Sequence, residues 1–306
     1  MVLAKIATLL SQTIGLDPDV VNSSRIARAA ETRRVGCKLP DIESYWARLQ
    51  TSAAELEELI ELLTVPETWF FRDGKPFDYL KTYVTSEWLP KLNRSKLQLL
   101  SVPSSTGEEP YSMAISMLEA GLQPQQFTID AIDISYQSLA KARRGIYTKN
   151  SFRGDAWRER YFQQTDKGYE LCQHVRQLVN FQQGNVMTSL GLIQKQYNII
   201  FCRHLLIYLQ SAACSQVLAT LDRILIPGGL LFVGGSETGK IVAQQYVQAE
   251  QSFQRAIYLE PKSYEALVHL ALLKENQGDP VGAKIVRQRI GRLPQGVLNS
   301  SLGGKS

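Results

Sequence analysis

The sequence predicts an α/β protein built on a doubly wound parallel sheet, with a helical domain before it and a helical segment after it. Three observations carry this prediction. From Leu97 onward, apolar strand-like segments alternate with helical ones, which is typical of a parallel sheet with crossover helices. Before that point, apolar residues recur at helical spacing. After about residue 241, helical spacing returns and the pattern repeats.

Residues 1–64 are expected to form the helical N-terminal domain. Two segments near its ends carry apolar residues three and four positions apart: Leu3, Ile6, Leu9 and Leu10 in the first, and Leu56, Leu59, Ile60 and Leu63 in the second. Pro18 fits the first turn of a further helix, with Asp17 as its N-cap.

One helix of this domain is predicted to be strongly basic. Its positive residues are Arg25, Arg28, Arg33, Arg34 and Lys38, against the single acid Glu31. Arg25 and Arg28 are three positions apart and share a helix face. This face is either an ordinary solvated surface or a docking surface that attracts an acidic protein partner.

Residues 65–240 are expected to form the sheet domain. Its strand-like segments are 97–102, 127–133, 197–202 and 229–235, and helical segments 110–120, 135–144 and 211–225 follow three of them. Between Tyr147 and Asn185 the alternation breaks into short strand-like pieces, such as 169–171 and 178–181, separated by polar turns. We expect a small antiparallel insertion over about residues 148–183.

Residues 241–294 are expected to form a helical repeat. Ala249 and Ala283 lie 34 positions apart, which is the period of a tetratricopeptide unit, and Phe253 and Pro261 fit its pattern. One half-repeat and one full repeat are fewer than the roughly three that such arrays need for stability. Residues 295–306 are polar and rich in Gly and Ser, and they are predicted to be disordered.

The turn after the first strand is the most informative stretch for function. Leu97–Val102 runs into the small residues Ser104–Gly107, and two carboxylates, Glu108 and Glu109, open the next helix. A strand, a small-residue turn and a helix N-terminus let a ligand approach backbone N–H groups. Because two carboxylates stand where a phosphate would lie, we expect a ligand with a cationic group rather than a nucleoside di- or triphosphate.

Other polar residues follow the remaining strands, where an α/β sheet presents its ligands. Asp133 is placed to accept both ribose hydroxyls of an adenosine, or else to cap the next helix. Asn185 could bind an adenine edge, or serve as an ordinary turn residue. Arg203 and Tyr208 follow the 197–202 strand and would border the same crevice.

Composition, apolar runs and charge argue against several classes of protein. With 44% hydrophobic and 21% charged residues, the chain reads as an ordinary soluble globular protein. Its apolar runs are far shorter than the ~20 residues of a membrane span, and its N-terminus lacks the features of a signal peptide. Four cysteines without CxxC spacing and three histidines argue against a metal site or a disulfide framework. A net charge of only +5 argues against nucleic-acid binding, and we expect a cytoplasmic protein.

Read together, these strings resemble the chemotaxis-receptor methyltransferase family, the CheR type. The resemblance runs to about Glu237 and rests on TWFFRD, SSTGEEPYSMAISM, KARRGIY, GNV, IIFCRHLLIYL and PGGLLFVGGSE, in this order. It implies a class I methyltransferase that uses S-adenosylmethionine to methylate glutamate side chains of chemoreceptors.

The resemblance also implies roles for individual residues. The residues implied to contact the cofactor are Glu109 or Glu108 for the ammonium, Asp133 for the ribose, Asn185 with Val186 for the adenine, and Cys202, Arg203, Thr68 and Arg72 as further contacts. Arg72 and Tyr208 are expected nearest to the transferred methyl group. The acidic receptor bundle would dock on Arg25, Arg28, Arg33 and Arg34.

The sequence also departs from the family pattern. Pro66 and His204 each stand where the family usually has Asn, and Ser236–Lys240 leads almost at once into the helical repeat instead of further strands. The alternative hypothesis is therefore a non-catalytic methyltransferase-like protein that acts as a tetratricopeptide adaptor in a chemosensory complex.

Overall fold

The computed structural model describes residues 2–91, 95–153, 158–239 and 264–290. It divides into two compact units, Met1–Ser236 and Glu237–Ser306, and each is described by itself. Among the described helices, none is both long enough and apolar enough to cross a bilayer.

The N-terminal domain is helical, as the sequence predicts, and its described residues form five helices. They are α1 (Val2–Ile14), α2 (Pro18–Val21), α3 (Ser23–Gly36), α4 (Ile42–Thr51) and α5 (Ala53–Leu63). Pro18 opens α2, and the Asp17 carboxylate accepts a hydrogen bond from the Asp19 N–H, so the predicted N-cap is confirmed. The helices enclose a core of their own, which includes Ile6, Leu10 and Tyr45.

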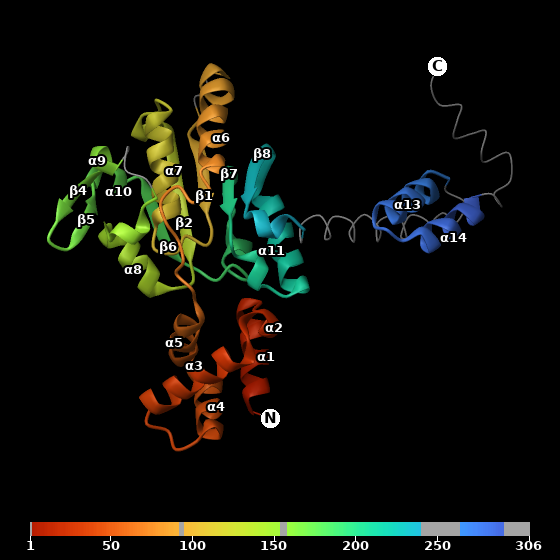
Figure 1. Cartoon of the computed structure of the whole chain (residues 1–306), viewed down its shortest axis with the longest axis horizontal. Helices are drawn as coiled ribbons and strands as arrows, with labels where there is room; N and C mark the ends of the chain where they lie inside the picture. The colour runs from red at the N-terminus through yellow and green to blue at the C-terminus, as the bar shows by residue number, and fades with distance from the viewer. Residues whose placement is uncertain (1, 92–94, 154–157, 240–263, 291–306) are drawn as a thin grey trace. The chain divides into compact units, whose positions relative to one another are not determined.

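The second part of this unit is a parallel sheet of five strands in the order β6-β2-β1-β7-β8 (Figure 1). The strands are β1 (Leu97–Ser101), β2 (Phe127–Asp133), β6 (Val179–Gln183), β7 (Tyr197–Cys202) and β8 (Leu225–Val233). The helices around it include α6 (Lys75–Tyr83), α7 (Glu108–Glu119), α8 (Tyr136–Arg144) and α11 (Ser211–Ile224). Strand order reverses between β1 and β7, which is where doubly wound sheets bind ligands.

A separate antiparallel sheet confirms the predicted insertion but corrects its extent. Its strands are β3 (Ile146–Tyr147), β5 (Gly168–Leu171) and β4 (Phe162–Thr165), with short helices α9 (Arg158–Tyr161) and α10 (Gln173–Arg176) nearby. The predicted insertion to residue 183 was wrong, because Val179–Gln183 pairs in parallel with β2 in the main sheet. This strand lies at the sheet edge and buries only part of its surface, so its residues alternate as in an antiparallel strand.

At the other edge, β8 begins at Leu225, earlier than the predicted residue 229, and pairs with β7 through a register shift. Among the described residues no further strand pairs with its outer side. The predicted strands 97–102, 127–133 and 197–202 and the three predicted helices are otherwise confirmed within two residues at each end.

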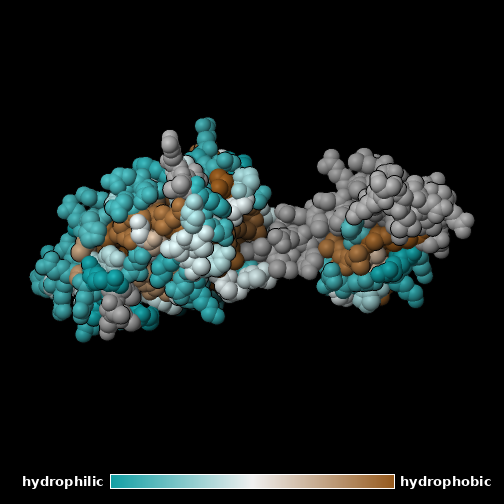
Figure 2. Space-filling model, turned by 90° about the horizontal axis from the view of Figure 1, so that it is seen from above, coloured by the Kyte–Doolittle hydropathy of each residue, from teal (hydrophilic) through white to brown (hydrophobic). Residues whose placement is uncertain are grey.

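The second unit contains the helices α13 (Tyr264–Asn276) and α14 (Pro280–Ile290). They pack through Leu267, Leu270 and Val286, and the Asp279 carboxylate accepts a hydrogen bond from the Gly282 N–H in the turn between them. Apolar side chains remain on the surface of this pair, which Figure 2 shows as brown: Leu272, Val281 and Ile285 are 45%, 69% and 62% exposed. A tetratricopeptide repeat stays a prediction, since the half-repeat at 249–261 and the tail at 295–306 lie outside the described residues.

Candidate functional site

A cavity lies where the N-terminal domain meets the carboxyl ends of the strands. Its walls come from the ends of α1, α2 and α5, Arg25 of α3, the first linker residues 64–66, the turns after β1 and β2, and the segments that follow β6 and β7. The lining residues are mainly apolar, with a few polar groups that include Ser105, Asp133 and Asn185. This combination is typical of a small-molecule site.

The turn between β1 and α7 forms one wall. Gly107 is the N-cap of α7 at φ +95°, and a Cβ there would lie 2.8 Å from the Ala142 Cβ, so the tight turn requires glycine. The Ser104 and Ser105 hydroxyls are buried, and neither has a hydrogen-bond partner in the part of the chain that the structure describes. Since Ser105 lines the cavity, its hydroxyl can bond a ligand.

Asp133 ends β2 and lines the cavity, as predicted. Its Oδ2 accepts from the Ser105 N–H at 2.7 Å and its Oδ1 from the Ser135 N–H at 2.9 Å. Burial raises the pKa of this carboxyl, while the two backbone hydrogen bonds act against that rise. Each oxygen keeps a lone pair for a further donor such as a hydroxyl. Ser135 caps the next helix, so the alternative role of Asp133 as N-cap was wrong.

Asn185 and Val186 also line the cavity, but the Asn185 amide already has partners. Its Nδ2 donates to the Thr13 carbonyl at 2.6 Å, and its Oδ1 accepts from the Met187 N–H at 3.0 Å. The side chain therefore fastens the end of α1 to the sheet domain. This contact, 172 residues apart in the chain, has no signal in the sequence.

Glu109 lies in a buried ion pair behind the turn rather than on the cavity wall. Its carboxylate accepts from the Ser101 hydroxyl at 2.9 Å and from Arg203 Nη1 at 3.0 Å. The Arg203 side chain is 1% exposed and also donates to the Arg72 carbonyl at 3.1 Å and pairs with Asp73. Arg203 thus joins the end of β7 to α7 and to the linker before α6.

Cys202 and Glu108 are buried and do not line the cavity either. The Glu108 carboxylate accepts from the Thr106 hydroxyl at 2.6 Å and from the Ser151 hydroxyl at 3.0 Å, which turns it toward the insertion. Burial raises its pKa, and the two hydroxyls oppose the rise. Of the two carboxylates, Glu109 therefore lies nearer to the strand ends, while Glu108 holds the insertion in place.

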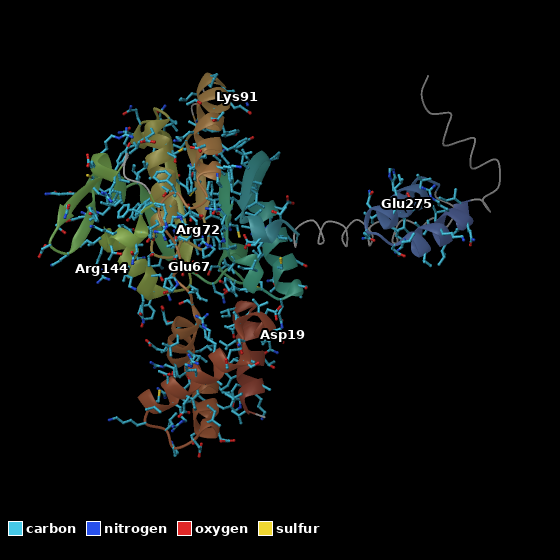
Figure 3. All side chains as sticks on the ribbon, in the orientation of Figure 1. Asp19, Glu67, Arg72, Lys91, Arg144 and Glu275 are labelled. Carbon is cyan, nitrogen blue, oxygen red and sulfur yellow. The ribbon has the colours of Figure 1, made fainter. Side chains whose placement is uncertain are left out.

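Thr68 and Arg72 belong to the linker between α5 and α6 and are half-buried outside the cavity wall. The Arg72 guanidinium lies 4.3 Å from the Trp69 ring centroid, and its Nη1 donates to the Glu67 carbonyl at 2.7 Å. Figure 3 shows Glu67 and Arg72 close together on this linker. The Arg72 Nε is buried and has no hydrogen-bond partner among the described residues.

Tyr208 lies in the cavity wall, in the short helix Leu206–Tyr208 after β7. Its ring packs on the core of the N-terminal domain, and its carbonyl accepts from the Asp17 N–H at 2.8 Å. The structure therefore brings Asp133, Asn185, Val186 and Tyr208 together around one cavity. Sequence reasoning missed Ser105 there, although the residue was part of the turn that it singled out.

The basic residues of α3 are largely engaged within the N-terminal domain. Arg25 lines the cavity and donates to the Leu63 carbonyl at 3.0 Å. Arg33 forms ion pairs with Glu55 and Glu58, and Arg34 pairs with Glu31. Arg28 is exposed. The docking role of this helix stays a prediction in which Arg28 is the most accessible of the four arginines.

No group of three or more His, Cys, Asp or Glu side chains within the described ranges is arranged to hold a metal ion. The geometry instead offers a carboxylate that accepts hydroxyls, an orphaned serine hydroxyl and apolar walls. Such a set suits a nucleoside-like ligand.

Comparison with known proteins gives a consistent result. The family described as "CheR methyltransferase, SAM binding domain" matches residues 66–255. "Probable biofilm formation methyltransferase WspC" of Pseudomonas aeruginosa is 43% identical over 234 residues, which cover 75% of this chain and 55% of that protein. "Chemotaxis protein methyltransferase" of Salmonella typhimurium is 32% identical over 220 residues, which cover 68% of this chain and 73% of that one.

The chain spans about half the length of the WspC proteins that it matches, the one from Pseudomonas putida included. Among solved structures, a putative rRNA methylase from Clostridium thermocellum aligns with a TM-score of 0.35 and 12% identity, over 56% of this chain and 77% of that one. The S-adenosylmethionine complex of the amino pentose methyltransferase CalS10 aligns with a TM-score of 0.34 and 15% identity, over 55% and 50%.

Proposed function

Because this chain belongs to the CheR methyltransferase family, we propose that it transfers a methyl group from S-adenosylmethionine to glutamate side chains of chemoreceptor-like signalling proteins. S-adenosylmethionine is the cofactor of the family domain. The observation that carries the proposal is the cavity at the strand ends, where Asp133 and Ser105 face the space that the N-terminal domain closes.

The residues present fit this cofactor. The Asp133 carboxylate has lone pairs for the two ribose hydroxyls, and the unpartnered Ser105 hydroxyl lies next to it. Val186, Ile134 and Leu205 line the cavity and give a planar base apolar walls. Of the two carboxylates that open α7, Glu109 lies nearer to the strand ends and is the candidate partner of an ammonium group, although Arg203 already shares it. When bound, the cofactor supplies a methyl group on a sulfonium sulfur, which keeps the bonding electron pair as a neutral thioether when a carboxylate oxygen takes the methyl.

The protein's own task in this reaction is positioning. A glutamate carboxylate is ionised at pH 7 and already nucleophilic, so no side chain has to remove a proton. The large contribution comes from holding the carboxylate in line with the methyl group. We propose that Tyr208, in the cavity wall, orients the acceptor from one side. The buried Arg72 Nε has no partner in the described part and can hold it from the linker side.

The direct test is transfer of labelled methyl from S-adenosylmethionine to the cytoplasmic fragment of a chemoreceptor by the full chain. We expect the receptor fragment to become labelled, and alkali to release this label as methanol, because the product is a carboxylic methyl ester. Label should disappear when the acceptor glutamates are replaced by glutamine. Label that survives this replacement would contradict the proposal.

A pair of variants on the same strand sharpens this test. Asp133→Ala should abolish both transfer and binding of S-adenosylhomocysteine in calorimetry. Asp130→Asn is the matched control, since Asp130 is also on β2 but pairs with Lys195 and Tyr197 away from the cavity, and it should keep both. The adaptor alternative predicts that the wild-type chain transfers no methyl group.

A further inference from the structure

The indole ring of Trp69, in the linker between α5 and α6, carries two guanidinium groups and lies outside the cavity wall. The Cζ atom of Arg72 lies 4.3 Å from the Trp69 ring centroid, and the Cζ atom of Arg153 lies 5.0 Å from the same centroid. Trp69 and Arg72 come from the linker, whereas Arg153 comes from the start of the insertion. We call these three residues the Trp69 cluster.

Hydrogen bonds hold the linker against the start of the insertion. The Phe70 N–H donates to the Ser151 carbonyl at 2.8 Å, and the Ser151 hydroxyl donates to Glu108 at the start of α7. Arg153 Nη1 donates to the Asn150 and Phe152 carbonyls at 2.8 and 3.1 Å. The Trp69 cluster is therefore held against the first turn of α7, at the same end of the sheet as the cavity.

The Trp69 cluster carries two positive charges and includes no negative charge. Two cations share one indole ring, and none of the ion pairs found within the described ranges involves either of them. The hydrogen bonds that they donate go to backbone carbonyls, and the Arg72 Nε has no acceptor there. Arg153 is exposed, so an anion can reach it from solvent. Like charges at one ring are stabilised when an anion binds between or beside them.

We propose that Arg153 of the Trp69 cluster binds an acidic side chain that flanks the methyl-accepting glutamate, while Arg72 of the same cluster holds that glutamate, and that Arg153 is a specificity-determining residue. This inference rests on the proposed function and names the side of the site from which the substrate enters. Guanidinium groups bind carboxylates through two parallel hydrogen bonds, and stacking on Trp69 holds them in place beforehand. Lysine would supply the charge without this planar fork.

The experiment compares full-length variants in the methyl-transfer assay. Arg153→Gln should raise KM for an acidic receptor fragment about tenfold, which corresponds to about 1.4 kcal/mol, with kcat and the Kd for S-adenosylhomocysteine within about twofold of wild type. The KM of Arg153→Lys should lie between the values of the wild type and of Arg153→Gln. The control is Arg144→Gln, which removes the same charge at an exposed position of α8 far from Arg72 (Figure 3) and should change KM less than about twofold.

An unchanged KM for Arg153→Gln, or an equal rise in Arg144→Gln, would overturn the inference while leaving the proposed function intact. If the wild-type chain transfers no methyl group, the proposed function fails by itself. Calorimetry of the receptor fragment in the presence of S-adenosylhomocysteine then decides: tenfold weaker binding by Arg153→Gln supports the Trp69 cluster, and equal or absent binding overturns it. Should Arg153→Gln fail to fold, Trp69→Leu removes the stacking while the Arg153 bonds to the Asn150 and Phe152 carbonyls remain possible, and the same KM rise is expected.

Discussion

The buried ion pair between Arg203 and Glu109 gives the sharpest stability prediction. In Arg203→Met, the Glu109 carboxylate, whose side chain is only 11% exposed, loses its ion pair with Arg203 at 3.0 Å. Removing one partner of a buried pair costs about 3–5 kcal/mol, because the remaining charge loses the opposite charge that offsets its desolvation. Asp73 is 51% exposed, so loss of its pairing with Arg203 adds at most about 1 kcal/mol.

Urea unfolding followed by tryptophan fluorescence measures this cost. All four tryptophans lie in the unit Met1–Ser236, so the signal reports on that unit. We expect Arg203→Met to lower the free energy of unfolding by about 3–5 kcal/mol. Arg160→Met is the matched control: Arg160 pairs with Glu119 at 2.7 Å but is 62% exposed, and its loss should cost less than about 1 kcal/mol.

A double-mutant cycle tests the reasoning itself. Glu109→Gln removes the charge that Arg203→Met leaves behind, so the double variant should be more stable than the sum of the single losses by about 2–3 kcal/mol. A cost below about 1 kcal/mol for Arg203→Met, or strict additivity in the cycle, would refute the view that Glu109 and Arg203 stabilise one another in the interior.

Three further outcomes follow from the site. The pKa of Glu108 is raised in the folded protein, so the free energy of unfolding should fall as pH rises above the ordinary value of 4.5, by at most about 1.4 kcal/mol per pH unit; Glu108→Gln should lose this slope in urea titrations at several pH values. Asp133 also has a raised pKa, and because its ionised form is the better acceptor for hydroxyls, affinity for S-adenosylhomocysteine should rise with pH as it ionises, a dependence that Asp133→Asn removes in calorimetry. Gly107→Ala places a Cβ 2.8 Å from the Ala142 Cβ at φ +95° and should destabilise the protein by more than about 1 kcal/mol, whereas Gly121→Ala, also at positive φ (+92°) but with open space around it, should cost less in the same assay.

The sequence predicted the elements that local patterns encode. Apolar periodicity located the strands at 97–102, 127–133 and 197–202, because burial on a sheet or a helix face repeats with the period of the backbone. It also placed Asp133 at the end of one parallel strand and Tyr208 in the segment that follows another, and both line the cavity. For Val179–Gln183 the pattern of apolar and polar residues did not identify the correct sheet. A half-buried edge strand has the same alternation in a parallel and in an antiparallel sheet.

Tertiary structure alone decided which charges are free and which are engaged. Arg203 and Glu109 lie 94 residues apart, Asn185 and Thr13 lie 172 apart, and Arg153 meets Trp69 across 84 positions. Each contact depends on where a side chain points after packing, and residue spacing carries no record of that. The sequence therefore indicates by itself that a ligand binds at the strand ends. Only the fold shows that Arg25 turns into the cavity, that Glu109 is shared with Arg203, and that two arginines meet at one tryptophan.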